Sequence, residues 1–346
     1  MRKLWTVAVA VAFLVGFQAH AAAGEKKPGG RKLRVGTMAM TVGIPVHYAD
    51  KFGLFKEAGL DIEVVVLATG APINEAMAAD QLDIAASGMA SVFGLSTGRY
   101  KYIGDGLRVM RGEVIFARPD SDIAKTPGPK PGVLGSADTV RGKNILGPLA
   151  TAAHLSAIKY AESLGLGVED FNMVSMDFSQ AQQAFMVGQG DLCASATPWS
   201  SQLVDAGYVM VSDLGQSQGI NLVDAIFVQE KLVDECREDL IAFLDCYYQA
   251  CDILDRDHEL WKKVGMEWYA EEGKSITEQQ MTFETEMKRY NTLDSILAAD
   301  NPFGSFMITI GEFFTGLGMI PDDNFPNIKA SLDDSLVREL KARRGK

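Results

Sequence analysis

The sequence predicts an α/β protein of two lobes, with parallel-rich sheets, flanking helices and a helical C-terminal region. Short apolar segments alternate with segments of helical period, which is the pattern of strands joined by crossover helices. This alternation comes in two sets, one before Ala117 and one after Asn144, and from Glu230 onward the apolar spacing is helical. We therefore expect residues 32–117 plus 226–346 to form lobe 1 and residues 118–225 to form lobe 2.

The first twenty-one residues have the features of a secretory signal peptide. Arg2 and Lys3 give a basic start, Leu4–Phe17 is apolar, and Ala19-His20-Ala21 is a small-x-small cleavage site. The alternative is a retained membrane anchor, although the apolar run is short for a membrane span. Residues 22–31 follow as a polar linker. We expect export to the periplasm and a mature protein that is not inserted in a membrane.

Composition limits the possible partners and cofactors. The net charge is −12, and it becomes −14 when Arg2 and Lys3 are removed with the signal peptide. An acidic chain without a basic stripe is not expected to bind nucleic acid. The four cysteines have no zinc-like spacing, and Cys246 and Cys251 are best interpreted as small buried side chains. We expect no metal, no cofactor and a monomeric protein.

Lobe 1 begins with two strand–turn–helix units. The first runs from a strand at Leu33–Gly36 through an aromatic-rich helix to a continuous apolar strand at Ile62–Leu67. The second has a strand at Leu82–Ala86 and a helix at Met89–Leu95, and Val114–Ala117 is a further strand. Loops at the carboxyl ends of such strands are where open α/β sheets bind ligands.

Lobe 2 continues the alternation after a Pro/Gly-rich loop, Lys125–Gly132, that no regular element can contain. Its predicted strands are Asn144–Leu146, Val174–Met176, Asp191–Ala194 and Val209–Val211, with helices at Thr151–Leu164, from Ser179 to Val187, and from Thr197-Pro198-Trp199. The chain then returns to lobe 1 through a strand at Ala225–Gln229 and helices at Ala242–Leu254, Glu259–Ala270, Thr277–Tyr290 and Phe306–Leu317. We place the two crossings near Phe116–Asp120 and Gly219–Ile226, a layout that permits hinge closure.

Several helix starts in these loops offer unbonded backbone N–H groups. The turns at Thr69–Ala71, Ser87-Gly88 and Thr151-Ala152 are candidates for binding an anion, because the first N–H groups of a helix have no partner within it. The alternative is that these hydroxyl residues only cap their own helices. Met38, Met40 and Met89 are candidates for an adaptable apolar wall or for core filling. Trp199 is either a stacking surface for a ligand or part of the lobe 2 core.

The chain resembles the periplasmic solute-binding proteins of ABC importers, in the group for sulfonates, taurine, nitrate and thiamine-pyrimidine precursors. The matching segments are ADKFGLFKEAGLDIEVV (Ala49–Val65), QLDIAASG (Gln81–Gly88), VRGKNI (Val140–Ile145), VGQGDLCASATPW (Val187–Trp199) and FFTGLGMI (Phe313–Ile320). The resemblance implies a two-lobed type II (Venus-flytrap) fold that holds a small molecule between its lobes and delivers it to an ABC permease. The segment Ile123–Asp138 is longer than the usual link in that family.

The resemblance also implies which residues contact the ligand. They are Met38, Met40, Thr41, Thr69, Gly70, Ala71, Ser87, Gly88, Met89, Thr151, Ala152, Thr197 and Trp199. We expect an organic sulfonate, a nitrate-like ion or a related anion, following the family. No arginine lies in these turns, so backbone N–H groups would have to hold the anion.

Two other functions stay open at this point. One is a receptor that presents its ligand to a sensor. The other is an enzyme on the same fold, since relatives include sulfinate hydrolases and pyrimidine synthases. A nucleophilic cysteine should lie on a cleft loop beside a base, but Cys193 lies within a predicted strand. His47 and His154 are expected to be structural. We therefore expect no enzymatic activity and no catalytic residues.

Overall fold

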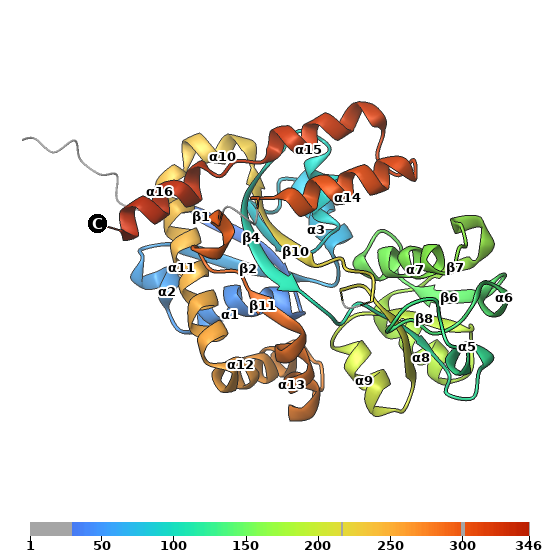
Figure 1. Ribbon diagram of the computed structural model, residues 1–346. Helices are drawn as coiled ribbons and strands as arrows, with labels where there is room; N and C mark the ends of the chain where they lie inside the picture. The colour runs from blue at the N-terminus through green and yellow to red at the C-terminus, as the bar shows by residue number, and fades with distance from the viewer. Residues whose placement is uncertain (1–29, 216, 299–301, 346) are drawn as a thin grey trace, which may run out of the picture.

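Two β-sheets, one in each lobe, organise the molecule (Figure 1). The structure is a computed structural model that describes residues 30–215, 217–298 and 302–345. The predicted signal peptide and most of the linker lie outside the described residues. Within the part of the chain that is described, no helix combines the length and the apolar character needed to cross a bilayer.

The first sheet has six strands in the order β11-β4-β10-β3-β1-β2. The strands are β1 (Lys32–Met38), β2 (Asp61–Leu67), β3 (Ile84–Ser87), β4 (Tyr100–Val109), β10 (Leu222–Gln229) and β11 (Lys288–Tyr290). Strand β1 pairs in parallel with β2 and β3, as expected for the two strand–turn–helix units. Strand β10 then inserts antiparallel between β3 and β4, and β11 is antiparallel to β4.

The second sheet has five strands in the order β7-β6-β8-β5-β9. The strands are β5 (Val114–Ala117), β6 (Asn144–Gly147), β7 (Asn172–Ser175), β8 (Leu192–Ser195) and β9 (Val209–Asp213). Strand β6 is parallel to β7 and β8, whereas β5 is antiparallel to β8 and β9. The α/β fold is confirmed, but both sheets are mixed rather than parallel-rich. The antiparallel pairs arise at the strands next to the two crossings, where the chain enters one sheet directly from the other.

One predicted element lies in the other lobe. Val114–Ala117 is expected in lobe 1, yet β5 lies in the second sheet, between β8 and the edge strand β9. The first crossing therefore lies between Val109 and Val114 rather than near Phe116–Asp120. The apolar pattern identifies a buried strand but not the sheet that receives it. The second crossing lies between β9 and β10, so we propose lobe boundaries at these two connections.

Helices cover both faces of each sheet. In lobe 1 they are α1 (Ile44–Lys51), α2 (Leu54–Glu57), α3 (Gly70–Ala78), α4 (Ser91–Leu95), α10 (Glu230–Glu235), α11 (Arg237–Arg256), α12 (His258–Glu271), α13 (Glu278–Met287), α14 (Ser305–Gly316), α15 (Phe325–Ser331) and α16 (Ser335–Arg344). In lobe 2 they are α5 (Asp122–Lys125), α6 (Ala137–Val140), α7 (Ala152–Ser163), α8 (Phe178–Met186) and α9 (Trp199–Asp205). Short 3-10 turns occur at Thr41–Gly43, Val168–Asp170, Ser295–Leu297 and Asp322–Asn324. Helix α8 is capped by Asp177, which accepts a hydrogen bond from the Gln180 N–H, and not by Ser179 as predicted.

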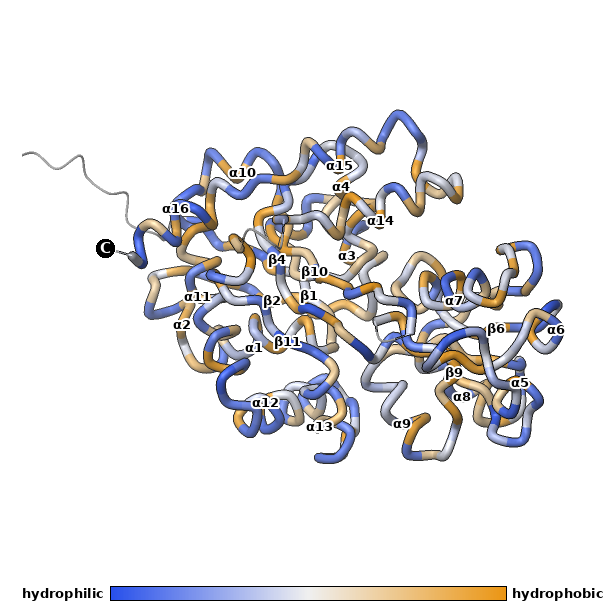
Figure 2. Tube along the Cα trace, viewed as in Figure 1, coloured by the Kyte–Doolittle hydropathy of each residue, from blue (hydrophilic) through white to orange (hydrophobic). Residues whose placement is uncertain are grey.

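Each lobe has its own hydrophobic core. The lobe 1 core joins the first sheet to the C-terminal helices, with Tyr247, Trp261 and Tyr269 fully buried. Lobe 2 has two buried clusters, one containing Ile145 and Ile158 and the other containing Phe116 and Phe185. Figure 2 shows hydrophobic residues along the strands and hydrophilic ones on the outer helices. Where the lobes meet, Leu155 of α7 belongs to the lobe 1 core, and Met40, Phe313 and Leu317 pack against the cores of both lobes.

Candidate functional site

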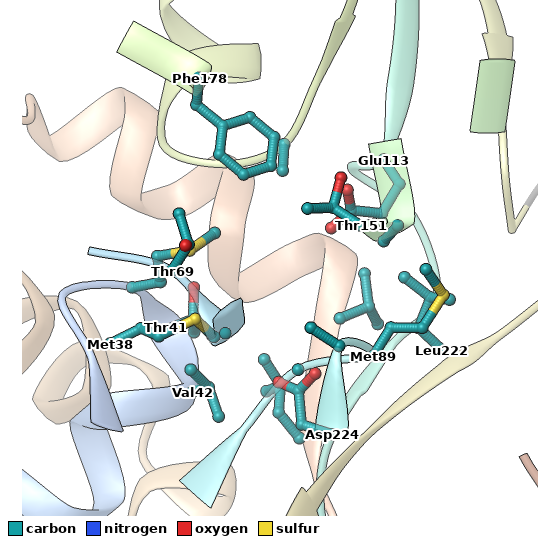
Figure 3. Close-up of a pocket in the computed structure, with 18 of the residues that line it drawn as sticks. Met38, Thr41, Val42, Thr69, Met89, Glu113, Thr151, Phe178, Leu222 and Asp224 are labelled. Atoms are coloured by element: carbon teal, nitrogen blue, oxygen red, sulfur yellow. The ribbon is translucent and has the colours of Figure 1, made fainter. Parts of the chain in front are cut away.

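A pocket lies between the two sheets and takes its walls from both lobes (Figure 3). Its volume is about 650 Å³, including the space open to solvent at its mouth. It is lined by Met38, Met40, Thr41, Val42, Thr69, Gly70, Gly88, Met89, Ala90, Leu107, Val109, Glu113, Thr151, Ala152, Phe178, Ala196, Leu222, Asp224 and Lys288. Most of these residues follow a strand or begin a helix, which is the position expected for ligand loops on an α/β sheet.

The lobe 1 wall depends on close packing between neighbouring turns. The Thr37 hydroxyl donates a hydrogen bond to the Ala86 carbonyl and ties β1 to β3 at the point where both strands reach the pocket. Gly70 begins α3 in contact with the turn before α4, where an added Cβ would lie 2.7 Å from the Cβ of Ala90. Only glycine allows this approach, so the sequence of this turn positions the pocket wall.

Two helix starts at the pocket are not capped by a side chain. Thr69 and Thr151 occupy the N-cap positions of α3 and α7 with extended backbone, but neither accepts a capping hydrogen bond. The Thr151 hydroxyl instead donates to the Pro148 carbonyl at 2.9 Å. The simple capping alternative is therefore wrong for these two threonines. The first N–H groups of α3 and α7 are left for a ligand or for water.

Nine of the thirteen predicted contact residues line the pocket, namely Met38, Met40, Thr41, Thr69, Gly70, Gly88, Met89, Thr151 and Ala152. The other four do not. Ala71 is exposed, and Ser87 is buried behind the wall. Thr197 is buried and accepts a hydrogen bond from the Lys288 ammonium. Trp199 stacks on Phe178, with ring centroids 5.0 Å apart, so that Phe178 rather than Trp199 faces the pocket.

The sequence interpretation missed ten lining residues, namely Val42, Ala90, Leu107, Val109, Glu113, Phe178, Ala196, Leu222, Asp224 and Lys288. One of them carried a usable signal. Asp224 interrupts the apolar segment LVDAIFVQ, and a carboxyl inside a buried strand needs a functional or structural reason. Nothing in the sequence indicates that Lys288 lines the pocket, because it belongs to the C-terminal region, far along the chain from the other pocket residues.

The Lys288 ammonium connects the two lobes at the base of the pocket. It donates to the Thr41 hydroxyl of lobe 1 at 2.6 Å and to the Thr197 hydroxyl of lobe 2. It also lies 3.6 Å from a carboxylate oxygen of Glu284, and the two side chains are only 4% and 0% exposed. Glu284 in turn accepts hydrogen bonds from Thr41 and from Tyr269. The buried ion pair is thus satisfied on both sides.

Glu113 and Asp224, hereafter the carboxyl pair, are acidic groups that line the same pocket. Burial raises the pKa of Glu113 to about 8 and the pKa of Asp224 to about 7, while the Lys288 charge opposes both shifts. One oxygen of Glu113, Oε2, is buried and has no hydrogen-bond partner. A buried oxygen without a hydrogen-bond partner destabilises the folded protein unless a ligand donates the missing hydrogen bond.

A second set of contacts joins the lobes beside the pocket. The Lys274 ammonium lies 4.6 Å from the ring centroid of Trp199 and donates a hydrogen bond to the Ala39 carbonyl. Burial lowers the pKa of Lys274 to about 8. Nearby, the Gln280 side-chain amide donates to the Asp205 carboxylate at 2.7 Å. The loop after α12 and the start of α13 therefore hold lobe 1 against α9 of lobe 2.

The residues considered for catalysis lie away from the pocket. Cys193 is fully buried within β8, and burial raises the pKa of its thiol to about 12, so it is not a ready nucleophile. His154 accepts a hydrogen bond from the Ala150 N–H, and His47 packs on Trp268. Across the described ranges, all four cysteines are unpaired, and the acidic, histidine and cysteine side chains form no cluster suited to a metal ion.

Two mixed α/β lobes with a pocket between them, joined by two chain crossings, define a protein of the periplasmic-binding-protein fold. The chain belongs to the NMT1-like family, whose model matches residues 26–265. A protein of Brachyspira hyodysenteriae, named as a candidate ABC transporter periplasmic binding protein, is 26% identical over 97% of each chain.

Solved structures confirm the fold. The alkanesulfonate-binding protein SsuA of Xanthomonas axonopodis pv. citri, bound to MOPS, superposes with a TM-score of 0.70 at 16% identity, covering 90% of this chain and 99% of its own. The nitrate-binding protein NrtA of Synechocystis PCC 6803 gives 0.70 at 16% identity, covering 90% and 88%. At these identities the likeness concerns the fold and not the ligand.

Proposed function

We propose that the protein is the extracytoplasmic solute-binding component of an ABC importer, acting in the periplasm after export. The observation that carries this proposal is the pocket between two lobes that each have their own sheet and that two chain crossings join. The name of the Brachyspira relative supports the same role. The partners implied are a small organic solute and an ABC permease. A receptor that presents the solute to a sensor would use the same pocket.

The proposed mechanism is hinge closure about the two crossings. A ligand in the pocket contacts Thr69 and Met89 of lobe 1 together with Thr151 and Phe178 of lobe 2. Such a ligand stabilises the closed arrangement selectively, because both walls reach it only when the lobes are together. The closed form is then the one that the permease recognises.

We propose that a polar or anionic group of the solute binds at the uncapped starts of α3 and α7. Their first N–H groups and helix dipoles favour negative charge. The structural relatives named for alkanesulfonates and nitrate make such a group plausible for this chain as well. Met38, Met40 and Met89 then cover the apolar part of the solute.

We propose no catalytic step for this site. The pocket-lining set contains neither cysteine nor histidine, and its one amine, Lys288, is engaged by Glu284 and two threonine hydroxyls. The site is suited to holding a molecule unchanged.

The test is a thermal-shift screen of the mature protein after unfolding, ligand removal and refolding. The panel contains sulfonates, nitrate, dicarboxylates, amino acids, amines and pyrimidines. A ligand present at about 100 times its Kd adds roughly 2.7 kcal/mol to the free energy of unfolding, so a true solute raises Tm selectively. Substitution of Thr151 and Phe178 together by alanine should abolish the rise, with Met186→Ala on the exposed surface as the control. Absence of any shift, together with no co-purified molecule by native mass spectrometry, would contradict the proposed function.

A further inference from the structure

The acidic side chains of the pocket indicate a chemical group of the solute that the helix starts do not indicate. Asp224 comes from β10, whose eight residues are all buried, and its side chain reaches the pocket beside the end of β3 (Figure 3). An added Cβ on Gly88 would lie 3.5 Å from its Oδ1. Asp224 is 9% exposed; burial raises its pKa and the charge of Lys288 opposes this shift, while the charge of Asp224 raises the pKa of Glu113.

Glu113 belongs to the first crossing and lines the same pocket as Asp224. Its carbonyl accepts hydrogen bonds from the Ser156 hydroxyl at 3.1 Å and from the Leu214 N–H at 3.0 Å, so its backbone is fixed against α7 and the second crossing. Its side chain is 7% exposed and lines the pocket, with Oε2 buried and unpartnered. A fixed backbone and an unsatisfied buried oxygen together indicate a binding group rather than a mobile surface carboxyl.

Lys288 does not complete the carboxyl pair. Its ammonium donates hydrogen bonds to Thr41 and Thr197 and lies 3.6 Å from a Glu284 carboxylate oxygen, and within the described chain it forms no ion pair with Glu113 or Asp224. Its charge influences Glu113 and Asp224 at longer range, whereas Asp213 and Glu284 add negative potential at Glu113. The two carboxyls therefore face the pocket without a cation in contact, which is unfavourable in a buried site unless a partner arrives from outside.

We propose that the solute carries a basic nitrogen group, an amine or an amidine, that donates hydrogen bonds to Asp224 and Glu113. This inference rests on the proposed function and specifies the solute class for the same pocket. A protonated nitrogen supplies both the positive charge and the N–H donors that the carboxyl pair lacks. The helix starts of α3 and α7 line the same pocket, so a solute that also carries an acidic group can use both kinds of binding group.

A consequence for pH follows from the protonation of the carboxyl pair. Burial raises both pKa values, to about 7 and about 8, so the empty pocket holds bound protons near neutral pH. A cationic nitrogen requires the ionised carboxylates, and its binding must therefore release protons. The affinity for such a solute should rise as the pH increases from 6 to 8.5, with Lys288, Glu284 and Asp213 as the other charged groups that face Glu113.

The experiment compares matched probes on the refolded mature protein. One pair is an ω-aminoalkanesulfonate with an alkanesulfonate of equal length, and the other is benzamidine with benzoate. Thermal shift and calorimetry measure the binding of each probe. We expect the nitrogen-bearing member of at least one pair to bind tenfold or more tighter. Asp224→Asn and Glu113→Gln should each reduce that affinity at least tenfold, whereas Asp138→Asn, an exposed carboxyl of lobe 2, should not change it.

Other outcomes separate this inference from the proposed function. If the alkanesulfonate and benzoate bind as tightly as their amine- and amidine-bearing partners, the inference is overturned while the proposed function stands. If no probe binds and no solute co-purifies, both are overturned. If the two pocket variants fail to fold, the inference is tested on the unaltered protein. Calorimetry in buffers of different ionisation enthalpy then measures how many protons are released when a probe binds. Proton release and tighter binding at higher pH support the inference, and their absence contradicts it.

Discussion

Lys288 links three parts of the molecule through one ammonium group. It contacts the loop after β1, the turn before α9 and the buried carboxylate of Glu284. None of these contacts can be replaced by water, because the side chains of Lys288 and Glu284 are almost completely buried. The residue therefore contributes both to lobe 1 stability and to the relation between the lobes.

Lys288→Met keeps the length of the side chain and removes its charge. We expect the free energy of unfolding to fall by about 3 kcal/mol, because the Glu284 carboxylate is left buried without its cation. Denaturation in urea measures the change. The double variant Lys288→Met with Glu284→Gln removes both charges and should recover part of the loss. A single variant as stable as the unaltered protein would show that the ion pair has no net role.

Individual site residues were predictable where they belong to a strand–turn–helix unit. Met38, Thr69, Gly88 and Thr151 all follow strands that the apolar pattern identifies, and all line the pocket. Glu113 was not predictable, because it precedes a strand that was assigned to the wrong lobe. The position of Trp199 was close but not correct, since stacking places Phe178 in front of it.

At the scale of elements, the contact between α3 and the turn before α4 is the tightest glycine-dependent part of the pocket wall. Gly70→Ala places a methyl group 2.7 Å from the Ala90 Cβ, so one turn must move. We expect a loss of about 1–3 kcal/mol in the free energy of unfolding, as for other overpacked positions, and weaker ligand binding. Denaturant titration measures the first effect and calorimetry the second.

Gly316→Ala is the matched control for this substitution. Gly316 ends α14, and an added Cβ there would have no atom within 4 Å. We expect stability to stay unchanged or to rise by about 0.5–1 kcal/mol, because alanine is the better helix former. Equal losses at Gly70 and Gly316 would mean that the approach of α3 to α4 is not a packing constraint.

Two strands escaped prediction for a physical reason. Strand β4 contains Gly104 and Gly106, which weaken its apolar alternation. The structure uses them to admit aromatic side chains, since added Cβ atoms would lie 2.6 Å from the Tyr248 hydroxyl and 2.8 Å from the Tyr247 hydroxyl. Strand β11 has only three residues and directly follows α13, so helical spacing concealed it.

At the scale of the whole molecule, the two lobes meet along the C-terminal region as well as at the crossings. The side-chain amide of Gln202 in α9 donates to the Ser275 carbonyl, and that of Gln280 donates to Asp205. The Gln202 contact is exposed, whereas Gln280 is buried and its bond to Asp205 is partly buried. A hydrogen bond of this kind contributes about 1 kcal/mol.

We expect the double variant Gln202→Ala with Gln280→Ala to shift the ligand-free protein toward open arrangements. Small-angle X-ray scattering should then give a larger radius of gyration than for the unaltered protein, and a bound solute should reduce the difference. The thermal stability of each lobe core should be preserved. A ligand-free radius identical to that of the unaltered protein would show that these contacts do not influence the opening of the pocket.

The division into two sheets was predictable from the two sets of alternating segments, and the pocket position from the loops that follow the strands. The direction of β10 and β5 was not, because local patterns carry no information about which strand a segment will pair with. The contribution of the C-terminal region to the pocket was also hidden, since Lys288 reaches it only through the long-range pairing of β11 with β4.

The order of strands along the chain also affects the order in which the two sheets can form. All five strands of the second sheet come from one uninterrupted stretch, Val114 to Asp213, whereas the first sheet needs β10 and β11 from beyond it. When the chain folds from its N-terminus, the second sheet can be completed while β3 and β4 still lack the strand that separates them. Until Leu222–Gln229 arrives, the edges of β3 and β4 that pair with it stay exposed to intermolecular pairing. This interval is when the chain is most in need of a chaperone.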